Sequence, residues 1–208
     1  MLAVIAIVAV RGSLHADQMR SVANPDRITI YTRTILFEWL SFGLVLVGVW
    51  LRRSSLSSVV GDRWSSARQF LRDVGIALAF LIVTIAVLSI FGPHGHDADS
   101  SVQFLLPHGG REAALWVLLS ITAGICEEVV YRGYLQKQFT ALTRSSAAGI
   151  IFSALIFGAA HSYQGFAKAS QIALLGAMGG LLAYWCRTVR PGMIAHALQD
   201  VLGGFFKH

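Results

Sequence analysis

The stretch VGIALAFLIVTIAVLSIFG, residues 74–92, decides the fold class because it contains no charged side chain. A helix rises about 1.5 Å per residue and needs roughly 20 residues to cross a membrane, and the length of this stretch is close to that number. Backbone groups cannot stay unpaired in lipid, so every such segment is expected to be an α-helix. Further apolar segments run over 34–51, 113–131, 147–163, 170–186 and 191–206. The sequence therefore predicts an all-α, polytopic integral membrane bundle of about six spans.

The composition supports a membrane protein and argues against a nucleic-acid partner. Of the 208 residues, 55% are hydrophobic and 13% are charged, whereas soluble domains carry about 25% charged residues. The formal net charge of +6 comes from Arg residues between apolar runs, with no basic stripe interleaved with aromatic residues. Contact with the lipid bilayer explains this pattern more simply than binding to nucleic acid.

The N-terminal segment 1–33 is expected to differ from the rest of the chain. Its apolar part, MLAVIAIVAV at residues 1–10, reaches only ~15 Å of the roughly 30 Å hydrocarbon core. A signal peptide that is removed has a basic region before its apolar stretch, and no basic region precedes this one. We therefore do not expect the segment to be removed. We therefore expect a short apolar helix followed by a basic segment, and one membrane-embedded helical domain over 34–208.

The distribution of Lys and Arg predicts the orientation of a multi-pass protein in the cell membrane. The segments 52–73, 133–146 and 187–190 carry five, two and two such residues, and the loops on the other side carry three. Loops rich in Lys and Arg stay in the cytoplasm. The segment 11–33 carries four Arg and runs against this pattern, because it would lie outside if 34–51 spans.

Charged residues inside apolar segments cost at least ~2.5–3.5 kcal/mol each, so they need an explanation. In ITAGICEEVVYRGYL, residues 121–135, Arg132 follows Glu128 by four positions and shares its helix face. Glu127 is then the freer carboxylate and a candidate general base. The alternative is a purely structural salt bridge at a helix end.

Two later segments carry histidines. His161 is the one ionisable group between Arg144 and Lys168, and neutral imidazole exchanges protons without bringing a permanent charge into lipid. His196 and Asp200 are four residues apart, so the carboxylate can orient the imidazole ring. A structural His–Asp bridge is the alternative for this pair. Glu38 lies within the 34–51 segment, and the sequence assigns it no role.

Three motifs together resemble a known family. The sequence contains neither HExxH nor GxSxG, and it lacks the Gly-x-Gly-Asp pattern of intramembrane aspartyl enzymes. EEVVYR (127–132) resembles the family's EExxxR motif, FGAAH (157–161) its FxxxH motif and HALQD (196–200) its Hxxx[ND] motif. The family is the CAAX-protease and bacteriocin-processing family, also called Abi or CPBP. The resemblance covers about 113–206, and nothing specific is recognised in 1–112.

This resemblance implies an intramembrane endopeptidase in which Glu127 and His161 activate water. By the same carry-over, His196 and Asp200 support the developing oxyanion or position the substrate carbonyl. Glu128 and Arg132 hold the site together. Asp200 stands where the eukaryotic prenyl-protein peptidases have Asn, so orienting His196 is its favoured task. The substrate is expected to be a membrane-associated protein or peptide, and the oligomeric state is left open.

Alternatives for the function and the cofactor remain at this point. A catalytically silent relative would act as a bacteriocin-immunity or regulatory membrane protein, and a proton-coupled transporter would use the same Glu and His residues. No cofactor is favoured, because a Glu–His pair activates water without a metal, although zinc is a candidate. Counted from the expected span ends, Glu127 and His196 lie within roughly 10 Å of the cytoplasmic boundary and His161 lies about 20 Å deep. One span must therefore be shifted, tilted or broken for the three residues to meet.

Overall fold

The computed structural model describes residues 25–91 and 103–205, and these residues form helices and no strand. The all-α prediction is confirmed for this part of the chain. The helix expected over 1–10, and most of the segment 1–33, lie outside the described residues. The helices are α2 (Arg27–Leu51), α3 (Ser57–Val60), α4 (Ala67–Phe91), α6 (Gly110–Glu127), the π-helix η1 (Glu128–Leu135), α7 (Gln136–Thr143), α8 (Ser146–Ala160), the 3-10 helix η2 (Ser162–Gln164), α9 (Phe166–Cys186) and α10 (Arg190–Phe205).

Four helices in the described residues are long and apolar enough to cross a membrane. They are α2, α4, the continuous helix from α6 through η1 to α7, and α9. The helices α8 and α10 have 15 and 16 residues, fewer than the roughly 20 that a span needs. Each of the six predicted segments is helical, but a count of six spans is not confirmed.

The segment predicted as a loop at 133–146 is helical as far as Thr143, which corrects the expected end of the span at 131. Polar residues such as Gln136 and Lys137 suggested that the helix ends before them. Their hydrogen-bond partners lie far away in the sequence and could not be predicted from it. The Gln136 side chain donates to the Gly180 carbonyl at 3.0 Å, and the Lys137 ammonium donates to the Ser58 carbonyl at 2.6 Å. These hydrogen bonds give the Gln136 amide N–H and the Lys137 ammonium partners on other helices.

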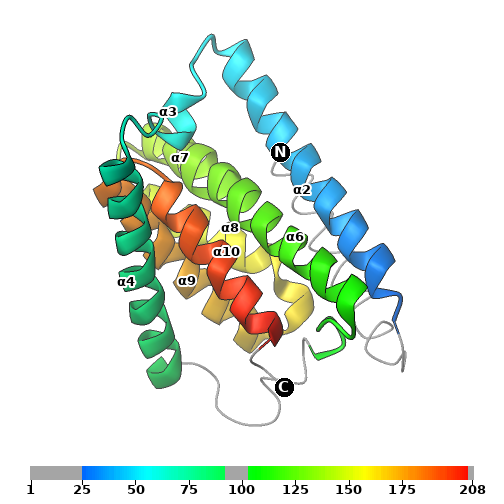
Figure 1. The fold of residues 1–208 in the computed structure, drawn as a ribbon. Coiled ribbons are helices and arrows are strands. Elements are labelled where there is room, and N and C mark those ends of the chain that lie inside the picture. The colour runs from blue at the N-terminus through cyan, green and yellow to red at the C-terminus, as the bar shows by residue number, and fades with distance from the viewer. Residues whose placement is uncertain (1–24, 92–102, 206–208) are drawn as a thin grey trace.

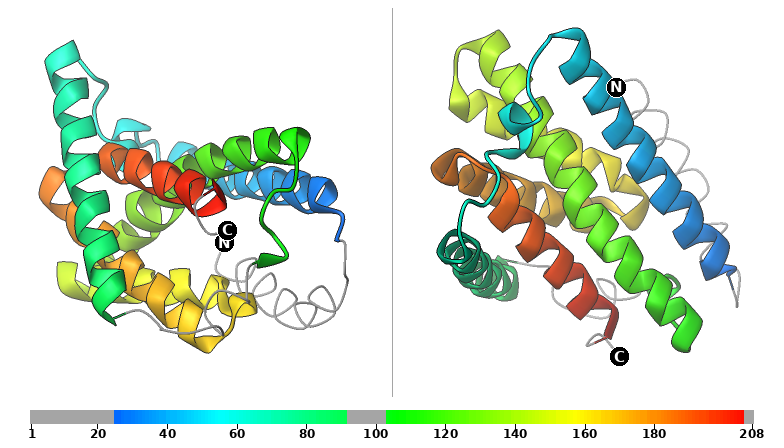
Figure 2. Two further views of the ribbon diagram at one scale, coloured as in Figure 1. Left: turned by 60° about the horizontal axis from the view of Figure 1, so that its bottom comes forward. Right: turned by 45° about the horizontal axis from the view of Figure 1, so that its top comes forward.

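The long helix α6–η1–α7 lies in the middle of the bundle (Figure 1). The helices α2 and α10 pack on opposite sides of α6, α4 packs on α10, and α8 and α9 form an antiparallel pair behind them. Figure 2 shows α4 standing away from α2 at the opposite side of the bundle. Residues of α2, α4 and α6 line a cavity in the bundle.

The three segments that are predicted to be cytoplasmic meet at one end of the bundle. The Thr188 hydroxyl and the Val189 N–H both donate to the Val60 carbonyl. The Arg52 guanidinium donates to the Gln138 side chain. The end of α7 and the turn between α9 and α10 therefore contact the α2–α4 connection, as expected for segments on the same side of a membrane.

We predict that these three segments are accessible only from the cytoplasmic side. Single cysteines at the exposed positions Ser55, Ala141 and Arg187 should react with an impermeant thiol reagent only when the cytoplasmic face is open. The test needs a background without Cys126 and Cys186. A cysteine at the exposed Arg111, at the opposite end of the long helix, is the control and should label from outside. Labelling of Ser55Cys from outside would reverse the orientation.

Candidate active site

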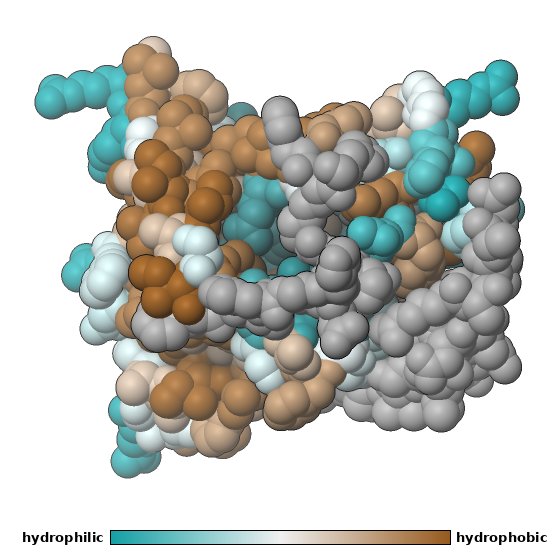
Figure 3. All heavy atoms as spheres, turned by 90° about the horizontal axis from the view of Figure 1, so that it is seen from below, coloured by the Kyte–Doolittle hydropathy of each residue, from teal (hydrophilic) through white to brown (hydrophobic). Residues whose placement is uncertain are grey.

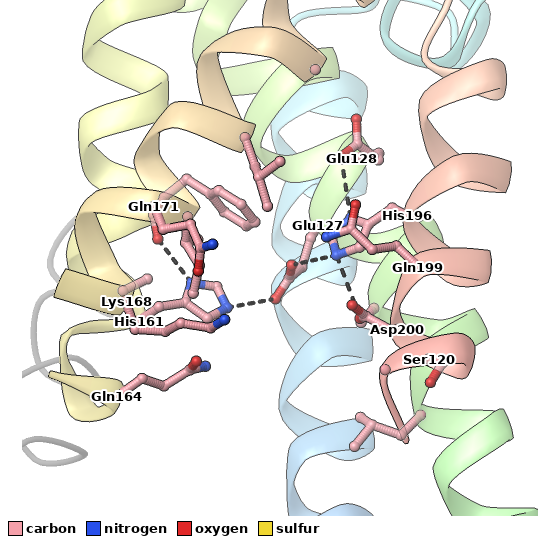
Figure 4. Close-up of a pocket in the computed structure, with 18 of the residues that line it drawn as sticks. Ser120, Glu127, Glu128, His161, Gln164, Lys168, Gln171, His196, Gln199 and Asp200 are labelled. Atoms are coloured by element: carbon pink, nitrogen blue, oxygen red, sulfur yellow. Dashed lines mark hydrogen bonds and ion pairs between the residues drawn. The ribbon is translucent and has the colours of Figure 1, made fainter. Parts of the chain in front are cut away.

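The structure brings together all of the residues that the sequence singled out. Figure 4 shows Glu127 between His161 on one side and His196 on the other, with Asp200 and Glu128 next to His196. Glu127 ends α6, Glu128 begins η1, His161 directly follows α8, and His196 and Asp200 lie on α10. One centre therefore receives side chains from three separate stretches of the chain.

The expected difference in depth between Glu127 and His161 is wrong. The chain turns back between α7 and α8. The end of α7 at Thr143 lies 16 residues after Glu127, and the start of α8 at Ser146 lies 15 residues before His161. At 1.5 Å per residue both lie about 22–24 Å from that turn. The discrepancy arose because the helix of Glu127 was expected to end near 131. Glu127 lies near the middle of a 34-residue helix, not close to its end.

The level of His196 agrees with this arrangement. His196 lies six residues, or about 9 Å, after the start of α10 at Arg190. That start is tied to α3, and the Val59 carbonyl of α3 lies against Gly133. Gly133 in turn follows Glu127 by six residues. Glu127 and His196 therefore lie at about the same height along the bundle, each six residues from the end of the bundle where α3 packs.

The carboxylate of Glu128 is neutralised inside the protein. Only 3% of Glu128 and 4% of Arg132 are exposed, and Arg132 Nη1 lies 3.2 Å from Glu128 Oε1. His196 Nδ1 lies 3.2 Å from the same oxygen. The guanidinium also stacks over the Phe157 ring at 4.2 Å, a favourable cation–π geometry. The pairing of Arg132 with Glu128 is as predicted.

Glu127 faces the two histidines. Its Oε1 atom lies 3.8 Å from His161 Nε2, and its Oε2 atom lies 3.5 Å from His196 Nε2. No Lys or Arg of the described residues forms an ion pair with Glu127. The carboxylate therefore faces two imidazole rings, each of which can donate or accept a hydrogen bond.

A backbone hydrogen bond determines the tautomer of His161. Its Nδ1 atom lies 2.9 Å from the Phe157 carbonyl oxygen, which can only accept, so Nδ1 carries the hydrogen. In the neutral ring Nε2 is then unprotonated and points toward Glu127 (Figure 4). The 3.8 Å between Nε2 and the carboxylate is longer than a direct hydrogen bond.

His196 has carboxylates on both sides. Its Nδ1 atom contacts Glu128, and its Nε2 atom lies 3.5 Å from both Glu127 and Asp200. Both nitrogens can donate to these oxygens only when the ring is protonated. The arrangement therefore favours a charged imidazolium that balances the surrounding carboxylates.

Small residues let α10 approach the long helix closely. A Cβ atom on Gly192 would lie 2.8 Å from Glu128 Oε2, and one on Gly124 would lie 2.8 Å from the Ala197 Cβ and 2.9 Å from the Met193 carbonyl. Any larger residue at these positions would push the two helices apart. The position of His196 therefore depends on glycine at both sites.

The charged residues lie at the wall of a cavity of about 950 Å³. Seen from the end where α6 begins, Figure 3 shows a hollow with a hydrophilic floor and a largely hydrophobic rim. Apolar side chains of α4, α6 and α9 line it, among them Phe80, Leu88, Leu119, Ile172 and Leu175. The cavity suits a substrate that is mainly apolar and reacts at a polar centre.

The structure adds polar residues that the sequence did not assign. Gln164, Lys168, Gln171 and Gln199 line the cavity near the histidines (Figure 4). Glu38 of α2 lines the same cavity. Burial raises the pKa of Tyr163, on the wall beside His161, to about 12, so its phenol stays protonated at neutral pH. The sequence could not place these residues, because their role depends on which helices face the cavity.

No group of three or more His, Cys, Asp and Glu residues in the described ranges is arranged to hold a metal ion. The Nδ1 atoms of His161 and His196 contact Phe157 and Glu128, and the Nε2 atoms of both rings face Glu127. Histidines that bind metals commonly have their second ring nitrogen bonded in this way, so zinc stays a candidate at this centre.

One family model matches a segment in the second half of the chain. Residues 109–202 match the family model described as Type II CAAX prenyl endopeptidase Rce1-like. Neither curated proteins nor solved structures give a match to the chain. The matched segment contains α6 to α10 up to Leu202, and therefore all three motifs, whereas α2 and α4 lie outside it. Residues 109–202 are thus similar to CAAX-protease-like membrane endopeptidases of the CPBP family, in agreement with the resemblance of the three motifs.

Proposed function

We propose that this protein hydrolyses a peptide bond of a membrane-associated protein or peptide, with water activated by Glu127 and His161. The observation that carries the proposal is the position of Glu127, whose carboxylate faces two imidazole rings at the wall of a largely apolar cavity. The match of residues 109–202 to the Rce1-like family model supports an endopeptidase. The assignment of roles to single residues is our inference from the geometry.

A water molecule between Glu127 and His161 would have two proton acceptors. Both Glu127 Oε1 and His161 Nε2 carry lone pairs that face one another across 3.8 Å. A water beside this gap can donate one hydrogen to each, which directs its own lone pair toward the cavity. Water held in this way is positioned to attack a carbonyl carbon.

The proposed reaction balances with these groups alone. Glu127 takes a proton as the water oxygen bonds to the scissile carbonyl carbon, and the carbonyl oxygen becomes an oxyanion. Protonated His196, oriented by Asp200 at 3.5 Å, lies 3.5 Å from Glu127 and stabilises that charge. The proton then passes from Glu127 to the amide nitrogen as the carbon–nitrogen bond breaks, which leaves a carboxylic acid and an amine. Proton transfer between these two products gives the carboxylate and the ammonium group.

We further propose that Glu128 and Arg132 support the site rather than react. Arg132 is nearly fully buried, and its charge is used by Glu128 and the face of Phe157. The Glu128 oxygen that binds Arg132 also binds His196 Nδ1. The pair therefore fixes the ring of His196, and its loss should disturb the position of that ring.

The first prediction is that Glu127→Gln lowers kcat by ~10²–10⁴-fold, the usual cost of losing a general base. The amide keeps the size of the side chain, so the yield of folded protein should stay near wild type. Cleavage of a membrane peptide by purified protein in proteoliposomes measures the effect, and His161→Ala should be similarly impaired. Asp62→Asn, at an exposed position, is the matched carboxyl-to-amide control.

The same assay separates the competing functions. Peptides that accumulate in membranes only when the active protein is present would reveal the substrate. Wild-type turnover by Glu127→Gln would show that this residue is not the base. Proton-coupled flux into vesicles without any cleaved product would favour a transporter. A biological function that survives Glu127→Gln would favour a silent regulatory relative.

The second prediction concerns stability. Arg132→Ala strands the buried Glu128 carboxylate, and breaking a buried ion pair costs about 3–5 kcal/mol. The variant should melt at a lower temperature and give less folded protein. Adding Glu128→Gln should recover part of the loss, because no charge is then stranded. Arg68→Ala, exposed at the start of α4, should change little, and equal stability of Arg132→Ala and wild type would contradict the argument.

The third prediction concerns metal. We expect dialysis against a chelator to leave the cleavage rate unchanged, because the Glu–His pair needs no metal to activate water. Added zinc should not increase the rate. Activity that is lost in chelator and returns with zinc would instead favour a metal mechanism, with the same carboxylate and imidazoles rearranged as ligands.

A further inference from the structure

A second carboxyl group reaches Glu127 from outside the family-matched segment. Glu38 lies on α2, is 8% exposed and lines the same cavity as Glu127. Its carboxyl group lies close enough to the Glu127 carboxyl group for a hydrogen bond between the two side chains. The family match begins at residue 109, so neither the family motifs nor the match includes this residue.

The position of Glu38 on its helix is not that of a surface residue. Tyr31, Glu38 and Val45 recur every seven residues along α2 and are all buried, so they form one stripe toward the bundle. An apolar side chain would be expected in the middle of such a stripe. A glutamate at this position carries a desolvation cost unless it is neutralised or paired.

The neighbours of α2 hold this stripe in register. The Tyr31 hydroxyl donates to the Leu105 carbonyl, and the Tyr31 ring packs edge-on against Trp116 with 5.6 Å between centroids. At the other end, Val45 and Val49 belong to the main core cluster. Glu38 is therefore held against the end of α6 by contacts on both sides of it.

A hydrogen bond between two carboxyl groups requires a proton on one of them. Two adjacent negative charges at a poorly solvated site repel each other strongly, so a shared proton resolves the conflict. No Lys or Arg of the described residues forms an ion pair with Glu38. Glu127, by contrast, faces His161 at 3.8 Å and His196 at 3.5 Å. The negative charge therefore belongs on Glu127 and the proton on Glu38.

We propose that Glu38 is a positioning residue of the active site, whose protonated carboxyl donates a hydrogen bond to Glu127 and holds that carboxylate turned toward His161. The inference rests on the proposed peptidase function. It adds that a residue of α2 completes a centre otherwise built from α6, η1, α8 and α10. Glu38 acts through Glu127 and not on the substrate, so its removal should change kcat and leave KM unchanged.

Three variants test this role. Glu38→Leu removes the donor but fits an apolar stripe, so the protein should fold, and kcat should fall by roughly 10–100-fold with KM unchanged, the size of a lost hydrogen bond to a charged group. Glu38→Gln keeps an N–H donor and should retain most of the wild-type kcat. Val45→Ala on the same stripe is the control, because it weakens the packing of α2 and should lower the melting temperature without lowering kcat.

A second measurement does not depend on turnover. Infrared spectra of the purified wild-type protein at neutral pH should contain the C=O stretch of a protonated carboxylic acid that disappears in Glu38→Gln and persists in Asp62→Asn. If this band behaves as expected but the wild-type protein cleaves nothing, the carboxyl pair stands and the proposed function fails. If the protein cleaves and the band is unaffected by Glu38→Gln, the pair fails and the function stands.

Two kinetic outcomes would also overturn the assignment. A wild-type kcat in Glu38→Leu would show that Glu127 needs no donor from α2. A Glu38→Gln variant as inactive as Glu127→Gln would show that the Glu38 proton is itself transferred, which makes Glu38 a catalytic acid and not a positioning residue.

Discussion

Two consecutive carboxyl groups buried in the middle of an apolar bundle are the constraint on which the rest of this structure depends. Glu127 and Glu128 are both buried, although Glu127 lines the cavity, and a buried charge without partners is far too costly to persist. The chain meets this cost by bringing Arg132 from the next turn and His161 and His196 from two other helices. The approach of α8 and α10 to the long helix is therefore both a requirement of stability and the way in which the site is assembled.

The sequence predicts the participants well because their signals are local. Each ionisable residue within an apolar run stands out by its cost, and the spacing of four between Glu128 and Arg132 suffices to predict their contact. The helical segments follow from hydropathy for the same reason. The depth of Glu127 could not be predicted, because the helix continues through Gln136 and Lys137, whose partners Gly180 and Ser58 lie far away in the sequence. Hydropathy cannot distinguish a polar residue in a loop from one that is satisfied by a distant carbonyl.

The contribution of α2 was hidden for a different reason. Glu38 is as unusual in its apolar segment as Glu127 is in its own, but nothing in the sequence says which helix packs against which. The register depends on contacts such as Tyr31 with Leu105 and Trp116, and these join residues about 75–85 positions apart. Helix docking of this kind follows from shape and packing over the whole bundle, so the position of a single side chain in the cavity becomes visible only in three dimensions.

The π-helix Glu128–Leu135 has a consequence for how this protein can change over evolution. Such a segment contains more residues per turn than the α-helices on either side. Adding or removing one residue without a change of helix type would rotate everything beyond that point by about 100° relative to α6. The face that carries Arg132 would then no longer match the face that carries Glu127, although every side chain of the motif would still be present. The number of residues between the first glutamate and α7 is thus constrained as strongly as their identities, whereas turns such as Arg187–Val189 can vary in length as long as α10 still starts beside α3.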